Sequence, residues 1–217
     1  MNFTLAVIFS FSIFIAAIIG CIRFRKISPV YYPFLYCLWL GTANELLSYI
    51  LIRMRHSTAI NISIYVLAES LLFTWQFKNW GLFKRSKILF PILIVSLILF
   101  WSVENFFMGG LQSPISYFRI FHSLLISIMS LNIINNQLNL ERKNIIKNPI
   151  FLICIVFVIY FTCDVVVGLF WLYGLHMSMK FQFNLAVIII YTNLFANLIY
   201  ALAVLWMPLK HRFTLPY

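Results

Sequence analysis

Seven long apolar stretches run through the chain, and short segments with basic residues, prolines or polar residues separate them. Each stretch holds about 20 residues, the length that an α-helix needs to cross the hydrocarbon core of a bilayer. The pattern predicts helical spans at residues 3–22, 32–52, 59–77, 88–107, 115–138, 150–172 and 183–206. We therefore expect an all-α fold, a polytopic bundle of seven transmembrane helices that forms a single domain over residues 1–217.

The composition agrees with a membrane protein. Hydrophobic residues make up 63% of the 217 residues and charged residues 10%, whereas a soluble domain is about 45–50% apolar and about 25% charged. No segment is long and polar enough to form a separate soluble domain. Any activity must therefore reside in the membrane helices and the short loops between them.

The net charge of +11 comes from basic residues that alternate between the two sides of the predicted spans. One side holds Arg23, Arg25, Lys26, Lys78, Lys84, Arg85, Lys87, Arg142, Lys143, Lys147, Lys210 and Arg212, and the other holds only Arg53, Arg55, Arg119 and Lys180. Because basic residues concentrate in cytoplasmic loops, the N-terminus is predicted outside and the C-terminus in the cytoplasm. We expect a multi-pass protein of the bacterial cytoplasmic (inner) membrane whose basic loops contact the lipid bilayer rather than nucleic acid.

No sequence motif identifies a reaction. The four histidines and four cysteines lack the spacing of a zinc site, and the chain has no nucleophile elbow, no phosphate-binding loop and no dinucleotide fingerprint. We therefore predict no cofactor and no metal site, and the chemistry disfavours an enzyme. A hydrolase that uses two nearby carboxylates stays as a minor alternative.

Four of the five acidic residues lie inside predicted spans, and they are Glu45, Glu69, Glu104 and Asp164. A charged side chain at the bilayer centre costs about 2.5–3.5 kcal/mol on insertion scales, and such residues usually pair, face a polar cavity or take part in function. With the predicted topology, the titratable residues of the spans gather between the middle and the outer surface. Glu104 lies at the outer rim.

Polar residues on five spans recur at intervals of three or four positions, which places them on one face of a helix. The main stripes are Asn44, Glu45 and Ser48; Asn61, Tyr65 and Glu69; Arg119, His122 and Ser123; Tyr160 and Asp164; and Asn193, Asn197 and Tyr200. Polar stripes also serve as contacts between membrane helices. A polar cavity and a packed structural network are therefore both compatible with the pattern.

The candidate ligand-binding residues are the ionisable groups of the outer half and their neutral neighbours. They are Glu45, Glu69, His122, Asp164, Arg119, Tyr65, Asn193 and Asn197. Convergent polar groups in an otherwise apolar cavity are typical of a small-ligand site. We expect Arg119 to pair with Asp164 or Glu104, and His122 to pair with Glu45 or Glu69.

Short motifs in three of the spans are similar to those of an uncharacterised group of small bacterial seven-helix membrane proteins. The matching segments are Asn61-Ile-Ser-Ile-Tyr65-Val-Leu-Ala-Glu69 with Gln76-Phe77, Asn148-Pro149-Ile-Phe151, and Asn193, Asn197 and Tyr200 at their observed spacing. The resemblance covers residues 60–206. It implies a seven-helix inner-membrane protein with Asn61, Tyr65 and Glu69 as group hallmarks, and it implies no known activity.

Three functional hypotheses follow from these observations. The leading hypothesis is a receptor-like sensor or binding protein with a pocket in the outer half for a small polar or charged ligand. Its inner loops are too short for an output domain, so it would signal through a cytoplasmic or membrane partner. The second hypothesis is a proton-coupled or cation transporter, in which Glu69 and Asp164 exchange protons. The third is a membrane scaffold or assembly factor with a purely structural polar network.

Overall fold

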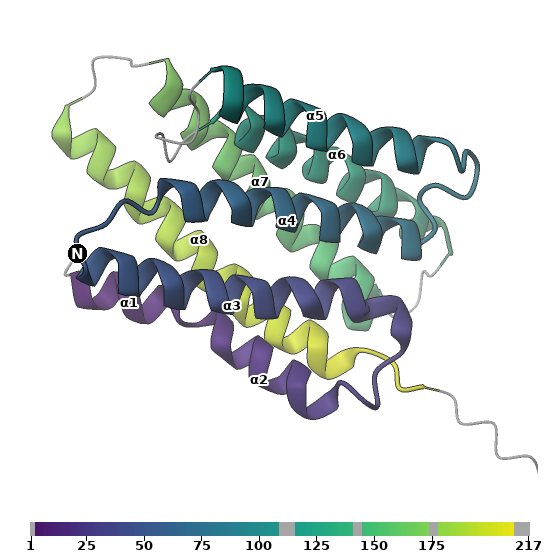
Figure 1. Ribbon diagram of the computed structural model, residues 1–217. Helices are drawn as coiled ribbons and strands as arrows, with labels where there is room; N and C mark the ends of the chain where they lie inside the picture. Colours follow the sequence, from purple (N-terminus) through teal and green to yellow (C-terminus); the bar gives the residue numbers. More distant parts are fainter. Residues whose placement is uncertain (1–2, 109–115, 141–144, 174–177, 211–217) are drawn as a thin grey trace, which may run out of the picture.

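The computed structural model describes residues 3–108, 116–140, 145–173 and 178–210, which form eight α-helices and two short 3-10 helices (Figure 1). The α-helices are α1 (Phe3–Ser10), α2 (Ile13–Arg23), α3 (Tyr32–Arg53), α4 (Ala59–Asn79), α5 (Leu89–Phe107), α6 (Tyr117–Leu140), α7 (Pro149–Leu172) and α8 (Met179–Trp206). The 3-10 helices cover Pro29–Tyr31 and Ile145–Lys147. Three basic residues of the predicted inner loops, Arg142, Lys143 and Arg212, lie outside the described residues.

Each predicted span coincides with a helix, and the first span differs only in being divided into α1 and α2. The division falls at Ser12, whose hydroxyl donates a hydrogen bond to the Phe9 carbonyl over 2.6 Å. Five helical segments are long and apolar enough to cross a membrane, and they are Pro29–Arg53, Leu89–Phe107, Tyr117–Leu138, Pro149–Leu172 and Phe183–Trp206. The described chain is therefore an all-helical bundle of the kind found in membranes.

Polar side chains determine where several helices begin and end. Asn148 is the N-terminal cap of α7, and its Oδ1 accepts from the Ile150 N–H over 2.9 Å, which satisfies a free donor of the first turn. At the start of α3, Gln76 accepts from the Phe34 N–H over 2.9 Å. At the end of α8, the Arg23 guanidinium donates to the Val204 carbonyl over 2.6 Å, as basic groups commonly do at helix C-termini.

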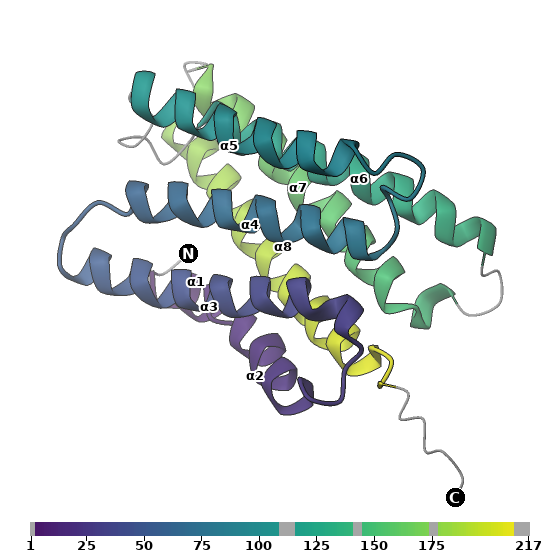
Figure 2. The same ribbon diagram turned by 45° about the vertical axis from the view of Figure 1, so that its right-hand side comes forward.

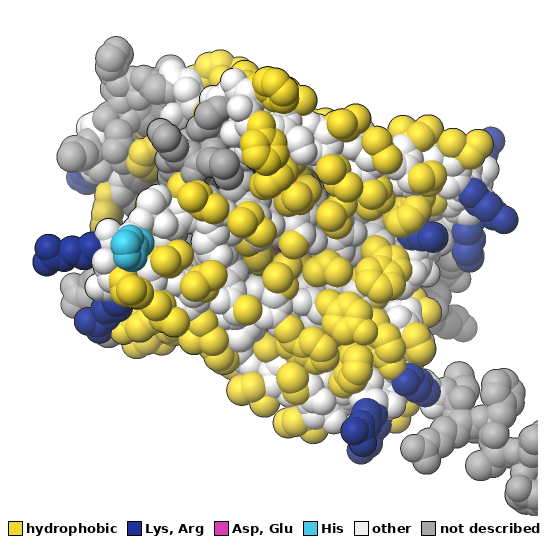
Figure 3. Space-filling model, viewed as in Figure 1, with side chains coloured by type: hydrophobic (Ala, Val, Ile, Leu, Met, Phe, Trp, Pro, Cys, Tyr) yellow, Lys and Arg dark blue, Asp and Glu magenta, His cyan; other side chains and the backbone are white. Residues whose placement is uncertain are grey.

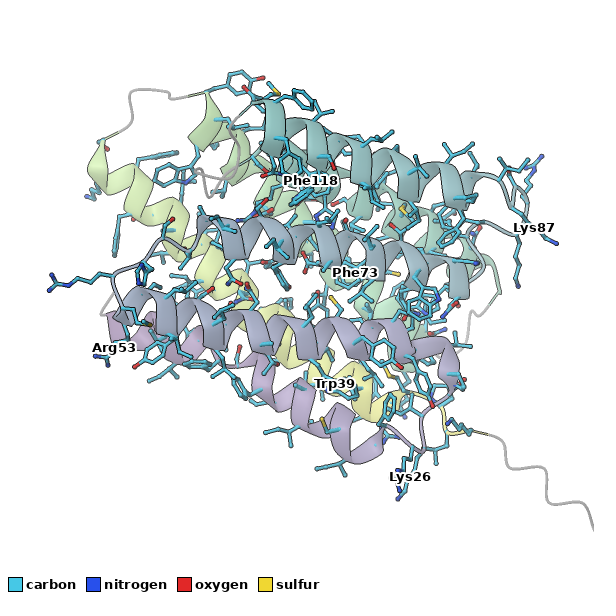
Figure 4. The ribbon with its side chains drawn as sticks, viewed as in Figure 1. Lys26, Trp39, Arg53, Phe73, Lys87 and Phe118 are labelled. Carbon is cyan, nitrogen blue, oxygen red and sulfur yellow. The ribbon has the colours of Figure 1, made fainter. Side chains whose placement is uncertain are left out.

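The helices form a ring. Each of α2, α3, α4, α6, α7 and α8 packs against the next, α8 closes the ring against α1 and α2, and α5 lies outside it against α4 and α6 (Figures 1 and 2). From α2 onward, successive helices run in opposite directions, so that α3 ends and α4 begins at the same end of the bundle. We name this the Arg53 end, and the opposite end the Lys87 end, after the residues marked in Figure 4.

The outer surface of the ring is apolar, and polar side chains lie inside it. Between 17% and 44% of each apolar segment is fully buried within the protein, and each segment also exposes large apolar side chains, among them Ile50, Leu99, Leu124, Val166 and Leu202. Figure 3 shows hydrophobic side chains across the middle of one face, with Lys and Arg gathered at the two ends. Soluble monomers rarely expose so large an apolar surface, whereas lipid tails solvate it.

Aromatic rings fill the centre of the ring in the half nearer the Lys87 end. They are Phe34, Phe73, Phe77, Phe157 and Tyr200, which come from four helices and which we name the aromatic floor. The ring centroids of Phe73 and Phe157 lie 4.5 Å apart, and those of Phe34 and Tyr200 lie 5.3 Å apart. Burial of such rings and their tilted contacts both stabilise this half. The other half is more open at its centre.

Candidate functional site

A cavity of about 300 Å³ occupies the centre of the ring in the half nearer the Arg53 end. We name it the central cavity. Six helices contribute to its wall, and its polar lining consists of Ser10, Asn44, Glu45, Ser48, Thr58, Tyr65, Glu69, Arg119, His122, Ser123, Tyr160, Asp164 and Asn193. The volume is at the lower limit of pockets that bind small molecules, which span about 300–1,000 Å³.

Seven of the eight predicted ligand-binding residues line the central cavity, and Asn197 does not. Asn197 lines a smaller space of about 50 Å³ between the central cavity and the aromatic floor, which we name the deep pocket. Tyr65, Glu69 and Asn193 border both spaces. The helical stripes predicted from sequence thus converge on one region.

Arg119 and Asp164 form a two-pronged ion pair across α6 and α7. The Arg119 Nη2 lies 2.7 Å from Asp164 Oδ1, and its Nε lies 3.1 Å from Oδ2. The Ser123 hydroxyl, one turn along α6 from Arg119, donates to Asp164 Oδ2 over 2.8 Å. Of the two partners predicted for Arg119, the structure selects Asp164, and the pairing neutralises two of the charges in the wall.

Glu104 has a different role from the other acidic residues of the spans. Its two carboxylate oxygens accept hydrogen bonds from the backbone N–H groups of Tyr117 and Phe118, over 2.6 and 2.7 Å. These donors belong to the first turn of α6, which has no intrahelical acceptors for them. Glu104 therefore anchors the start of α6 to the end of α5 and contributes nothing to the cavity wall.

His122 pairs with neither Glu45 nor Glu69, so the predicted hydrogen bond between them is absent from the described residues. Its imidazole is 1% exposed and packs against Phe118 and Phe161, with ring centroids 6.4 and 5.4 Å away. Its Nε2 has no hydrogen-bond partner among the residues described. A buried polar atom without a partner costs about 1–3 kcal/mol, and here that atom belongs to the wall of a cavity.

Glu45 and Glu69 lack basic partners. Glu69 accepts a hydrogen bond from the Tyr65 hydroxyl, one turn away on α4, over 2.8 Å. Glu45 and Ser10, at the end of α1, line the same part of the wall. The Arg119–Asp164 pair is the single ion pair within the described part of the chain. The lining of the central cavity therefore has two more carboxylates than guanidinium or ammonium groups.

Other predicted polar residues link helices rather than line the cavity. The Asn61 side-chain amide donates to Asn44 Oδ1 over 2.8 Å and to Ser48 Oγ over 2.9 Å, which joins α4 to α3. Asn197 donates to the Ser12 hydroxyl over 2.9 Å and so joins α8 to the α1–α2 junction. Hydrogen bonds of this kind are typical of contacts between membrane helices.

The structure adds cavity residues that were absent from the predicted set. Tyr160 and Ser123 had a visible sequence signal, since each lies one turn from Asp164 or Arg119 on the same helical face. Ser10 had none, because it lies at the end of α1 and reaches the cavity only through the tertiary packing of α1, mainly against α8. A side space of about 170 Å³ between α1 and α3 borders Ser10, Glu45 and Ser48, so it adjoins the central cavity.

Comparison with models of known protein families found no match, and neither curated proteins nor solved structures gave one. No group of three or more His, Cys, Asp or Glu side chains in the described ranges is arranged to hold a metal ion. The functional assignment therefore depends on the geometry of the central cavity itself.

Proposed function

We propose that the chain is a seven-span receptor-like protein of a bacterial inner membrane, with its N-terminus outside, that binds a small polar or charged ligand in the central cavity. The observation that carries the proposal is the convergence of charged and polar side chains from separate helices on one cavity of about 300 Å³. In a purely structural network, polar groups would satisfy one another and fill the space between them. Here Glu45, Glu69 and His122 line a space without filling it.

The aromatic floor favours binding from one side over passage through the bundle. Phe34, Phe73, Phe77 and Phe157 are each at most 4% exposed, and their rings contact one another across the centre of the ring. With the topology proposed from the basic loops, the floor separates the cavity from the cytoplasm. A ligand would then enter from the outer surface, and its presence would be transmitted through helix packing to a partner.

Accessibility of a single cysteine tests this proposal. In a protein with Cys21, Cys37, Cys154 and Cys163 replaced by alanine, Ser48→Cys puts a thiol in the cavity wall. A membrane-impermeant, positively charged thiol reagent is added to intact cells or to inverted vesicles. We expect labelling from the outside only, because the aromatic floor blocks the inner route.

The matched control is Leu47→Cys, at the neighbouring position on α3, where the side chain is 46% exposed on the apolar exterior. A thiol in contact with lipid should stay unlabelled from either side. Labelling of Ser48→Cys from both sides would contradict one-sided binding and favour transport of a cation or proton. If Ser48→Cys is unlabelled in a folded protein, the cavity is closed and the scaffold hypothesis replaces the proposal.

A further inference from the structure

The charge balance of the central cavity indicates the charge of its ligand. Three carboxylates and one guanidinium line the cavity, and the pairing of Arg119 with Asp164 leaves Glu45 and Glu69 without counter-charges. Carboxylates inside membrane helices are unfavourable unless they are compensated. A cationic ligand would supply the missing charge, whereas an anionic one would add to the excess. The imbalance therefore favours a cationic ligand over an anionic one.

The two carboxylates lie at different depths. Because Asn61 bonds to both Asn44 and Ser48, it is level with the α3 residues midway between them. Glu69 lies eight residues beyond Asn61, about 12 Å along α4 at 1.5 Å per residue. Glu45 is one residue before the α3 position that is level with Asn61. Because α3 runs antiparallel to α4, Glu45 therefore lies only about 1.5 Å from that level, toward the same end of the bundle as Glu69. The two positions are thus separated by roughly 10 Å along the bundle.

The surrounding spaces agree with this separation. Glu45 also borders the side space between α1 and α3, and Glu69 also borders the deep pocket. Metal–oxygen distances are about 2.0–2.6 Å, much shorter than the separation of these two positions along the bundle. A ligand that contacts both carboxylates must be elongated.

Apolar and aromatic side chains line the cavity along with the two carboxylates. They include Ile62, Val66, Phe161, Ile189 and Ile190, with the rings of Tyr65 and Tyr160. Methylene groups bury favourably against such surfaces, and aromatic faces attract cations. His122 adds to the same wall an Nε2 that has no hydrogen-bond partner in the described part of the chain. The lining thus suits a molecule with charged ends and an apolar middle.

We propose that the central cavity binds a linear organic dication of the α,ω-diamine class, with one ammonium at Glu45 and the other at Glu69. This inference rests on the proposed function, because it names the ligand class of the same cavity. Each ammonium lies about 2.8 Å from its carboxylate. The remaining distance of roughly 5–10 Å between the nitrogens suits a staggered chain of about four to seven methylenes.

The test measures binding of three molecules of equal chain length by calorimetry on the purified full chain in lipid nanodiscs. The probes are 1,6-diaminohexane, hexylamine and hexane-1,6-diol. We expect the diamine to bind at least tenfold more tightly than the monoamine, because it forms a second charged hydrogen bond. We expect Glu45→Gln and Glu69→Gln each to weaken diamine binding about tenfold or more and to remove its advantage over hexylamine.

Glu104→Gln is the matched control, since this carboxylate lies in the same half of the bundle but outside the cavity. It should leave diamine binding unchanged. Equal binding of the diamine and hexylamine, or unchanged binding after both cavity substitutions, would overturn the inference. If a variant does not fold, the inference is tested instead by measuring the affinity of the unmodified protein for diamines of two to ten carbons. An affinity maximum at intermediate length supports the inference, and a steady rise with carbon number or no binding overturns it.

The outcomes separate this inference from the proposed function. If Ser48→Cys is labelled from outside and the diamines do not bind, the open cavity stands and the dication is wrong. If hexane-1,6-diol binds as tightly as the diamine, a binding site exists but charge does not select its ligand. If Ser48→Cys is unlabelled and no probe binds, both proposals fail.

Discussion

Breaking the ion pair between α6 and α7 should strongly destabilise the protein. Asp164 is 8% exposed and accepts two hydrogen bonds from Arg119 and one from Ser123. Asp164→Leu removes the carboxylate and leaves the guanidinium without a counter-charge inside the bundle. Removing one partner of a buried pair costs about 3–5 kcal/mol. Because the Arg119 side chain is 28% exposed, we expect the lower end, about 3 kcal/mol.

Removing both charges together should cost less than the sum of the two single changes. In Asp164→Leu with Arg119→Met, neither charge is left unpaired, and the Ser123 hydroxyl loses one acceptor at a cost of about 1 kcal/mol. Arg119→Met alone also leaves the Asp164 carboxylate without its partner, so a double-mutant cycle should give a coupling energy of at least about 2 kcal/mol between the two positions. The coupling energy, rather than the size of either single effect, measures the interaction between the Arg119 and Asp164 side chains.

The assay is unfolding in mixed micelles with increasing denaturing detergent, followed by tryptophan fluorescence. Four proteins are compared: the unmodified chain, Asp164→Leu, Arg119→Met and the double variant. The reasoning is wrong if the double variant loses the sum of the two single effects, since additivity means that the two side chains do not interact. It is also wrong if Asp164→Leu costs less than about 1 kcal/mol, which is below the value for a buried pair.

Substitutions test three further contacts between helices, using the same unfolding measurement. Glu104→Ala should cost about 1–3 kcal/mol because it leaves two N–H groups at the start of α6 without acceptors, and Glu104→Gln should cost less. Gly168→Val should cost about 1–3 kcal/mol, since a Cβ there would lie 2.8 Å from Ile120 Cγ1, and Ile120→Ala should recover part of the loss. Gln76→Leu should cost about 1–3 kcal/mol because the buried Phe34 N–H loses its acceptor. A loss below about 0.5 kcal/mol, typical of surface changes, would contradict the corresponding contact.

The helices were predictable because their signal is local. An apolar stretch of about 20 residues indicates both the length of a helix and its location in a membrane. The predicted boundaries agree with the observed helices to within a few residues, except at the start of α8. The break at Ser12 was not predicted, since Ser10 and Ser12 are the only polar residues of an otherwise apolar stretch over residues 5–19 and the hydroxyl bond from Ser12 to Phe9 leaves no periodic signal.

The candidate site was predictable as a set of helical faces but not as a set of contacts. Spacing of three or four residues groups Tyr65 with Glu69 on α4, and the structure joins them by a hydrogen bond. The same spacing does not distinguish Asp164 from Glu104 as the partner of Arg119. The choice of partner depends on how α5, α6 and α7 are rotated about their axes. Arg119 and Asp164 are 45 positions apart in the sequence, so local spacing carries no information about this rotation.

The sequence by itself determined the helical class, the positions of the apolar stretches and the polar faces, because each depends on residues within a few turns of one another. Only the tertiary structure decided that Glu104 anchors a helix start, that His122 Nε2 has no hydrogen-bond partner among the described residues and that Glu45 and Glu69 face an open space. These features arise where helices meet. Their packing depends on the volumes and directions of side chains from many parts of the chain at once.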